Sequence, residues 1–187
     1  MKAWMFLGAV LAVASATGAE MYGAKFSDSI ELDGKTLVLN GLGPRKAIFG
    51  IRVYVAGLYL DAKSKDPEAI VSSETTKNLK LSFVRKVEAA KIRDAWSEGL
   101  GKSDNCGGDC ASFKDRLTEL NSWMSDMKEG SHMEFTFRTG GVEVWVNGAR
   151  KGEVKGGDFG KALLRIWLGK DPPNEDLKKG LLGELKS

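Results

Sequence analysis

The side chains that most often carry chemistry are scarce in this sequence, which has one histidine, His132, and two cysteines, Cys106 and Cys110. A structural zinc site needs four nitrogen or sulfur ligands, and a catalytic triad needs a histidine beside a nucleophile and an acid. His132 directly follows Gly130 and Ser131, ahead of a predicted strand, which is typical of a solvated loop histidine. We therefore expect no metal site, no cofactor and no histidine-based catalysis.

The two cysteines form the run Cys106-Gly-Gly-Asp-Cys110. Glycines give the backbone the freedom to bring two cysteines four positions apart within bridging distance. The spacing is not Cys-x-x-Cys and the chain has no second ligand pair, which disfavours a redox pair or a metal site. The run therefore predicts a local disulfide that pins a turn, provided that the compartment is oxidising; free thiols are the alternative.

The first nineteen residues have the features of a secretory signal peptide. Lys2 supplies a positive charge, residues 3–13 are apolar, and residues 14–19 are small. An apolar stretch of about eleven residues falls short of the roughly 20 that span a bilayer, which disfavours a membrane anchor. We expect a signal peptide over 1–19 and a mature domain over 20–187, exported to the periplasm if the host is Gram-negative. No later segment predicts a membrane span.

Composition describes an ordinary globular domain. The 187 residues are 42% hydrophobic and 28% charged, proportions typical of one domain with a sizeable core. The 28 Lys and Arg residues and 25 Asp and Glu residues are interleaved along the chain and leave a net charge of +3. Because no basic stripe or block stands out, nucleic-acid binding is disfavoured.

Periodicity and turn signals predict the elements that must position any site. Asp33-Gly34 is typical of a two-residue hairpin turn, and the glycines and proline of 41–44 predict a break before a long central strand over 46–60. The odd positions of that strand, Phe49 and Ile51 among them, form its apolar face. We expect strands over 25–32, 35–40, 46–60, 79–83, 133–139, 142–146 and a short one ending at 154, and helices over 67–72, 88–100, 111–127, 158–169 and 174–185.

The order of these elements determines the fold class. Strands come first, then a helix pair, then strands, then helices, with no regular β-α-β alternation. The hairpin signals indicate antiparallel pairing. The sequence therefore predicts an α+β fold in which an antiparallel sheet of about six or seven strands carries helices on one face.

Three segments resemble the chalcone isomerase-like family, especially its exported bacterial members. They are residues 39–45 (LNGLGPR), 49–60 (FGIRVYVAGLYL) and 162–172 (ALLRIWLGKDP). The resemblance spans nearly the whole mature chain. It implies an open-faced β-sandwich with an apolar cleft between sheet and helices. The family includes plant chalcone isomerases, which cyclise a chalcone to a flavanone without a cofactor, and fatty-acid-binding relatives.

The resemblance also implies roles for particular residues. The family's carbonyl-polarising arginine matches Arg45 in the Gly-x-Gly-x-Arg turn, and a threonine of the true isomerases falls on Tyr54. The family's active-site tyrosine has no counterpart in residues 85–92. A threonine and a methionine near the end of the later helix fall on Ile166 and Trp167. Three of the five expected active-site positions therefore lack isomerase chemistry.

These correspondences favour binding over catalysis. Arg45 can pair bidentately with a carboxylate, and Tyr54 can donate a third hydrogen bond. We expect Arg45 and Tyr54 to hold the headgroup of a fatty-acid-like, amphipathic or aromatic ligand beside Ile166 and Trp167, with Arg52 and Tyr59 as weaker candidates. The tryptophans at 96, 123 and 167 are expected in the core, with the pocket wall as the alternative.

Two other functions stay open. One is an intramolecular lyase that cyclises chalcone to flavanone, in which Arg45 and Tyr54 would be catalytic and Arg45 would stabilise an enolate oxyanion. The other is a cell-envelope interaction module that presents the predicted helix pair and the Cys106–Cys110 turn to a protein partner of unknown identity.

Overall fold

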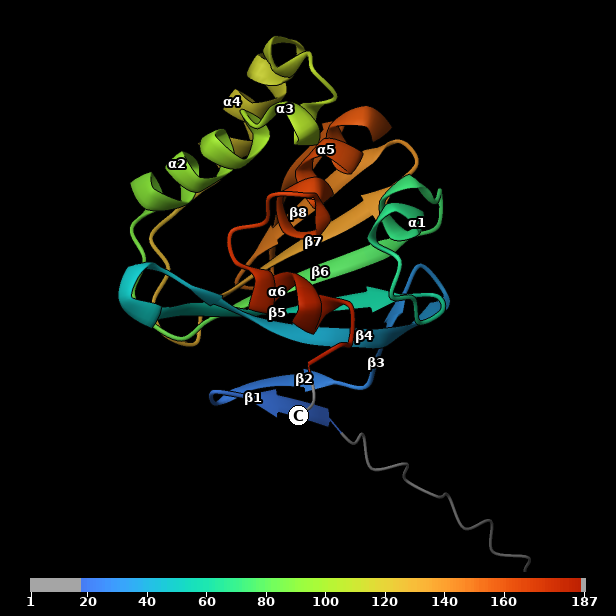
Figure 1. Ribbon diagram of the computed structural model, residues 1–187, viewed down its shortest axis with the longest axis vertical. Helices are drawn as coiled ribbons and strands as arrows, with labels where there is room; N and C mark the ends of the chain where they lie inside the picture. Colours follow the sequence, from blue (N-terminus) through green and yellow to red (C-terminus); the bar gives the residue numbers. More distant parts are fainter. Residues whose placement is uncertain (1–17, 186–187) are drawn as a thin grey trace, which may run out of the picture.

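A computed structural model describes residues 18–185 of the chain (Figure 1). The predicted signal peptide lies outside the described residues, except for Gly18 and Ala19 at the start of β1. The strands are β1 (Gly18–Met21), β2 (Ala24–Ser27), β3 (Ser29–Leu32), β4 (Lys35–Lys46), β5 (Arg52–Leu60), β6 (Lys77–Phe83), β7 (His132–Arg138), β8 (Gly141–Val146) and β9 (Ala149–Lys155). The α-helices are α1 (Pro67–Ser72), α2 (Ala89–Leu100), α3 (Ser103–Cys106), α4 (Lys114–Ser122), α5 (Gly157–Leu168) and α6 (Glu175–Leu181).

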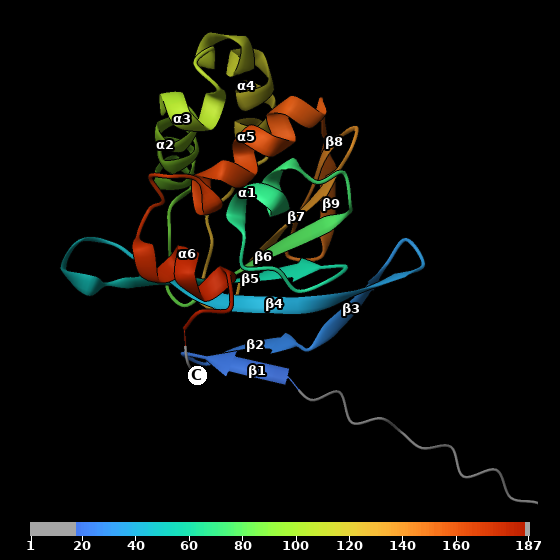
Figure 2. The same ribbon diagram turned by 45° about the vertical axis from the view of Figure 1, so that its right-hand side comes forward.

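The predicted α+β architecture is confirmed. Seven strands form one antiparallel sheet in the order β3-β4-β5-β6-β7-β8-β9, and the helices lie on one of its faces (Figures 1 and 2). The β1–β2 hairpin, which the sequence did not predict, covers β4 and β5 from the opposite face. The Asp33-Gly34 turn is present between β3 and β4, with both residues at positive φ. The sheet is therefore a meander that is open on most of its second face.

Two apolar clusters stabilise these layers. The larger lies between the sheet and the helices, where Phe159, Leu163 and Trp167 of α5 are fully buried. The smaller lies under the β1–β2 hairpin and includes Phe26 and Tyr59. Alternation along β5 divides its side chains between the two clusters, so both faces of this strand are covered.

The predicted break at 41–44 is wrong, because β4 runs unbroken from Lys35 to Lys46. Its glycines allow α6 to pack directly on the strand. A Cβ at Gly43 would lie 2.1 Å from the Leu177 carbonyl oxygen, and a Cβ at Gly180 would lie 2.1 Å from the Leu42 carbonyl oxygen. Helix and strand thus meet backbone to backbone, which only glycine permits.

Two asparagines hold the ends of this glycine contact. Asn40 donates a hydrogen bond to the Leu181 carbonyl (2.7 Å) near the end of α6. Asn174 donates to the Pro44 carbonyl (3.0 Å) and accepts from the Lys46 amide (3.1 Å) at its start. Asn174 occupies the N-cap position of α6, but its side chain makes no capping hydrogen bond and instead joins α6 to β4. The fold therefore fixes the end of β4, where Arg45 lies.

The predicted central strand over 46–60 is not continuous: Lys46 ends β4, and β5 begins only at Arg52. The chain reverses through a 3-10 turn, η1 (Ile48–Gly50), so that Lys46 pairs with Arg52 across β4 and β5. Phe49, expected on a core face, lies in this turn at positive φ and is 97% exposed. Because the residues of this turn are apolar, the sequence around it resembles one uninterrupted strand.

The helix predicted over 111–127 is shorter in the structure. A 3-10 turn, η2 (Cys110–Phe113), leads into α4, which ends at Ser122, and Met127 forms an isolated β-bridge with Val87. The helix expected to start at Asp158 begins at Gly157 after the N-cap residue Gly156, and Asp158 in its first turn pairs with Arg116 at 2.7 Å. Tertiary contacts override the local signals at both places.

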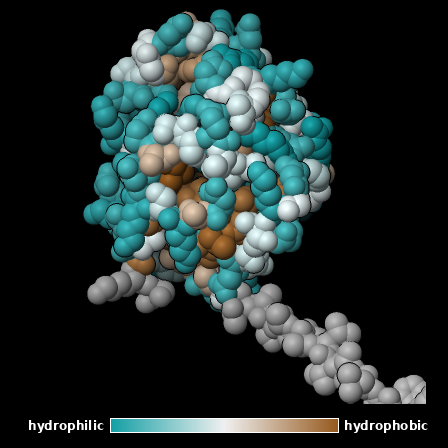
Figure 3. Space-filling model, turned by 90° about the vertical axis from the view of Figure 1, so that its right-hand side faces the viewer, coloured by the Kyte–Doolittle hydropathy of each residue, from teal (hydrophilic) through white to brown (hydrophobic). Residues whose placement is uncertain are grey.

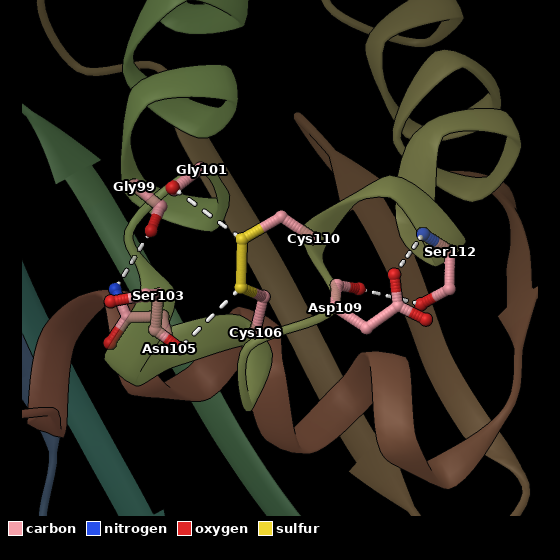
Figure 4. The surroundings of a disulfide bond; sticks show 8 residues. All are labelled: Gly99, Gly101, Ser103, Asn105, Cys106, Asp109, Cys110 and Ser112. Carbon is pink, nitrogen blue, oxygen red and sulfur yellow. Dashed lines mark hydrogen bonds between the residues drawn. A yellow bond between two sulfur atoms is a disulfide. The ribbon is translucent and has the colours of Figure 1, made fainter.

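The predicted disulfide joins Cys106 to Cys110 at the turn between α2 and α4 (Figure 4). Gly107 and Gly108 both have positive φ, as the tight loop requires. Beside the bond, Asn105 donates a hydrogen bond to the Gly99 carbonyl at 2.8 Å and ties the loop to α2. The disulfide therefore constrains the turn between α3 and η2.

The surface on the α1 side is mainly hydrophilic, with apolar side chains gathered near its middle (Figure 3). Within residues 18–185, none of the helices combines the length and the apolar character that crossing a bilayer requires.

Candidate functional site

A cavity of about 630 Å³ lies between the sheet and α2. Side chains of β4, β5 and β6 form its floor, α2 forms one wall, and the segment that joins α5 to α6 closes it. Its size is in the range of small-molecule sites. The apolar lining includes Val53, Tyr54, Phe83, Ile92, Trp96 and Ile166.

Arg45 and Tyr54 lie directly opposite each other on the paired strands β4 and β5, and both line the cavity. Arg45 is half-buried, and its guanidinium donates a hydrogen bond to the carbonyl oxygen of Lys46. One guanidinium nitrogen is thereby engaged with the backbone, and the other donors of the group stay available to a ligand.

Burial and a tryptophan fix the phenol of Tyr54. Tyr54 is 6% exposed, and its ring meets the Phe83 ring edge-on at 5.6 Å. The indole Nε1 of Trp167 donates to the Tyr54 hydroxyl oxygen at 3.0 Å. Because this contact uses the oxygen as an acceptor, the hydroxyl hydrogen can be donated to another group. Burial raises the pKa of Tyr54 to about 12, although the Trp167 hydrogen bond and the charge of Arg45 oppose that shift.

The tryptophans divide between core and cavity. Trp96 lines the cavity, and its ring lies 5.3 Å from that of fully buried Trp167. Trp123 packs over Gly152 of β9, away from the cavity lining. Trp96 is thus a wall residue of the cavity. Trp167 lies outside the lining and donates a hydrogen bond to Tyr54, and Trp123 packs against the edge of the main core.

The structure does not bring Arg52 or Tyr59 to the cavity. The guanidinium carbon of Arg52 lies 3.9 Å from the centre of the Tyr22 ring, outside the lining. Tyr59 faces the β1–β2 hairpin, where its hydroxyl donates to the Ser27 carbonyl at 3.0 Å. Of the two residues expected beside the ligand, Ile166 lines the cavity and Trp167 does not.

A basic rim was missed by sequence reasoning. The charged lining residues are Arg45, Arg85, Lys86, Lys91 and Lys102 against Glu88, Glu98 and Asp171. Lys102 pairs with Asp171 at 2.9 Å, so the excess positive charge lies with Arg45, Arg85, Lys86 and Lys91. The adjacent cations Arg85 and Lys86, directly after a strand, were the available signal.

The cavity thus combines apolar walls, a guanidinium, a phenol donor and a positively charged rim. Such a site suits one anionic headgroup on an apolar body. Residues 18–185 contain no group of three or more His, Cys, Asp or Glu side chains placed to hold a metal ion.

Alkaline titration should reveal the buried tyrosines. Burial raises the pKa values of both Tyr54 and Tyr59 to about 12, whereas unfolded tyrosines ionise near 10. Between pH 10 and 12 the folded chain keeps protons that the unfolded chain releases, so the free energy of unfolding should fall across this window and not below it. For a fully buried group the slope approaches about 1.4 kcal/mol per pH unit.

Urea unfolding at a series of pH values measures this fall, and absorbance at the tyrosinate band follows ionisation in the folded protein. Tyr54→Phe should make the decline shallower, because it removes one of the two groups. A flat profile up to pH 12, with ionisation of the folded tyrosines near pH 10, would contradict the burial described for these hydroxyls.

Comparison with known proteins agrees with this fold. The family model described as chalcone isomerase-like matches residues 18–183. Among solved structures, a fatty-acid binding protein from Arabidopsis thaliana has a TM-score of 0.73 at 19% sequence identity, over 89% of this chain and 96% of that chain. No curated protein matches the sequence. The likeness to the Arabidopsis protein shows a shared fold.

Proposed function

Because this chain belongs to the chalcone isomerase-like family, we propose that it binds a fatty-acid-like carboxylate in the cavity between the sheet and α2. The single observation that carries the proposal is the pairing of Arg45 with Tyr54 at the floor of a cavity that has apolar walls and a charged rim. A solved protein of the same fold is a fatty-acid binding protein, which adds support.

The headgroup contacts follow from the two side chains. The guanidinium offers a charge-assisted, two-pronged hydrogen bond to a carboxylate. Tyr54 adds a neutral donor, because a tyrosine hydroxyl is protonated at physiological pH and the oxygen of this one already accepts from Trp167. The carboxylate would therefore meet donors and no competing anion at this point of the floor.

The apolar tail would extend along the remaining walls. Val53 and Phe83 line the sheet side, and Ile92 and Trp96 line the helix side. Burying a hydrocarbon chain between these surfaces is favourable in proportion to the apolar area removed from water. Export to an oxidising compartment, the predicted location, agrees with the Cys106–Cys110 disulfide.

Calorimetric titration with hexadecanoic acid tests the proposal, with its methyl ester as the matched ligand. The acid and the ester have the same tail, and only the acid presents an anion to Arg45. We expect the acid to bind about 10-fold or more tightly than the ester. Equal affinities would reject carboxylate recognition, and no binding of either ligand would reject the site as an acyl-chain site.

Cyclisation of chalcone is the alternative that uses the same pair, with Arg45 and Tyr54 polarising a carbonyl. The position where the isomerase resemblance implies a threonine holds Ile166, whose side chain has no hydrogen-bond donor, and the position where it implies a methionine holds Trp167, whose Nε1 hydrogen is already donated to Tyr54. Loss of chalcone absorbance on addition of the protein, abolished in Arg45→Ala, would establish turnover and displace the binding proposal.

A further inference from the structure

Two neighbouring turns expose apolar side chains beside the cavity. In the turn between β4 and β5, Ile48 is 77% exposed, Phe49 is 97% exposed and Ile51 is 43% exposed. In the turn between β1 and β2, Tyr22 is 44% exposed. We call these four side chains the apolar tip. With Leu185 they make up the large hydrophobic side chains that are exposed in the described residues.

The apolar tip stands away from the body of the protein. The β4–β5 turn lies at the left-hand edge of both ribbon views, and Figure 2 shows it projecting well beyond α2 (Figures 1 and 2). Hydrogen bonds from the Ala47 amide to the Ile51 carbonyl (2.7 Å) and from the Gly50 amide to the Ala47 carbonyl (3.1 Å) close this turn. The backbone therefore presents the apolar side chains in a defined shape.

The backbone of Phe49 also indicates that exposure is not incidental. Its φ is +60°, in the left-handed region that aromatic residues rarely adopt. Such a position carries a conformational cost and tends to occur where it serves a function. No packing contact compensates this cost, since the side chain is 97% exposed.

Cations surround the apolar tip. Arg52 lies between the two turns, with its guanidinium carbon 3.9 Å from the Tyr22 ring centre. Arg85 and Lys86 follow Val84, whose amide donates to the Val53 carbonyl at 3.1 Å, so they emerge beside the base of the β4–β5 turn. All three cations are exposed, and none forms an ion pair with the part of the chain that the structure describes. The nearby Lys46 is already paired with Asp176 at 2.6 Å.

We propose that the apolar tip and these cations dock the protein on the surface of an anionic phospholipid bilayer. Projecting aliphatic and aromatic side chains can enter the headgroup–acyl boundary, and each arginine or lysine near the surface is attracted to anionic headgroups. Tyr22 adds an aromatic ring with a polar end, a side chain that favours membrane interfaces. A bilayer offers both chemistries together, over a patch only a few side chains wide.

Docking would place the mouth of the cavity at the bilayer. Ala47 and Ile51 of the turn line the cavity, as do Arg85 and Lys86. An apolar carboxylate could then pass between bilayer and cavity without crossing water. This last step rests on the proposed function, whereas docking itself does not.

Vesicle flotation of the ligand-free protein tests the proposal, with phosphatidylcholine vesicles that contain about 30% phosphatidylglycerol and with pure phosphatidylcholine vesicles. The double substitution Ile48→Ser with Phe49→Asn removes the most exposed apolar groups, and asparagine tolerates the positive φ. Leu185→Ser is the matched control, because it removes an exposed apolar side chain elsewhere. Arg85→Gln with Lys86→Gln tests the charge, and Lys151→Gln on β9 is its control.

We expect the wild type to prefer the anionic vesicles. The tip double variant should lose about 10-fold or more in partitioning, and the charge double variant should lose the preference for phosphatidylglycerol, while both controls behave as wild type. Unchanged partitioning of the tip variant, or no binding of the wild type at low salt, would overturn the proposal. Self-association of the wild type that the tip variant abolishes, without vesicle binding, would also overturn it and assign the tip to a second copy.

The same samples separate this proposal from the proposed function. The tip double variant should bind hexadecanoic acid in solution with wild-type affinity, because neither Ile48 nor Phe49 lines the cavity. Vesicle binding without acid binding would leave docking intact and reject the ligand. Acid binding without vesicle binding would reject docking and leave the proposed function intact.

Discussion

Replacing Arg45 with alanine should weaken the binding of hexadecanoic acid at least about 100-fold. Each hydrogen bond to a charged group contributes roughly 1.5–3 kcal/mol, and the guanidinium is placed to make two with a carboxylate. Arg45→Lys should retain part of the affinity, because it keeps the charge but loses the two-pronged geometry. Calorimetric titration of the wild type and both variants measures the effect.

Arg52→Ala is the matched control for this experiment. It removes the same side chain from the strand paired with β4, but Arg52 lies over Tyr22 and outside the cavity lining. Its affinity for the acid should stay within about two-fold of the wild type. An equal loss in both variants would point to general electrostatic attraction, and an unchanged affinity in Arg45→Ala would refute the headgroup site.

Replacing Gly43 with alanine should destabilise the protein by at least about 3 kcal/mol, which is large for so small a side chain. The added Cβ would lie 2.1 Å from the Leu177 carbonyl oxygen and 2.9 Å from the Leu177 Cα, so the clash is with backbone. Either β4 or α6 must move. Urea unfolding measures the loss as a lower midpoint with a similar slope.

The same variant should weaken acid binding, because α6 and β4 are fixed to each other around the site. Asn174 joins the start of α6 to Pro44 and Lys46 on either side of Arg45, and the preceding Pro172 and Pro173 line the cavity. Gly140→Ala is the control: a Cβ there meets nothing within 4 Å. If the two alanine variants unfold at the same urea concentration, the glycine contact does not support the fold.

Local signals predicted the elements that local physics determines. Asp33-Gly34 adopts positive φ at both positions, as its hairpin requires. Helix α1 has Pro67 at its first position. The side chain of the preceding Asp66 accepts hydrogen bonds from the Glu68 and Ala69 amides. The Cys106–Cys110 bridge needs only its own glycine-containing loop. In these places the turn or cap chemistry lies within a few residues of sequence.

The wrong predictions come from contacts between distant segments. Gly41 and Gly43 predict a break by propensity, yet they permit the close approach of α6, which follows more than a hundred residues later. Ile48 and Phe49 look like core residues in a strand, yet they form an exposed turn between two paired strands. Hydrophobicity alone does not distinguish a buried strand from an apolar surface turn.

The candidate site depended on the family resemblance more than on the residues themselves. Nothing local to Arg45 or Tyr54 indicates that they are opposite each other; the resemblance placed both in a cleft, and the strand register brings them together. Arg52 lies two positions before Tyr54, a spacing that places both on one face of a regular strand, but a register shift between Arg45 and Lys46 interrupts the pairing there. Tyr59 is one step out of phase with Tyr54, and its side chain lies on the opposite face.

A crystal structure with an ω-bromo fatty acid tests the central claim most directly, because the carboxylate shows as density and the bromine as anomalous signal. We expect carboxylate oxygens within about 3 Å of the Arg45 guanidinium and the Tyr54 hydroxyl, with the chain between the sheet and α2. A ligand seated outside the cavity, or one whose carboxylate meets neither Arg45 nor Tyr54, would contradict it.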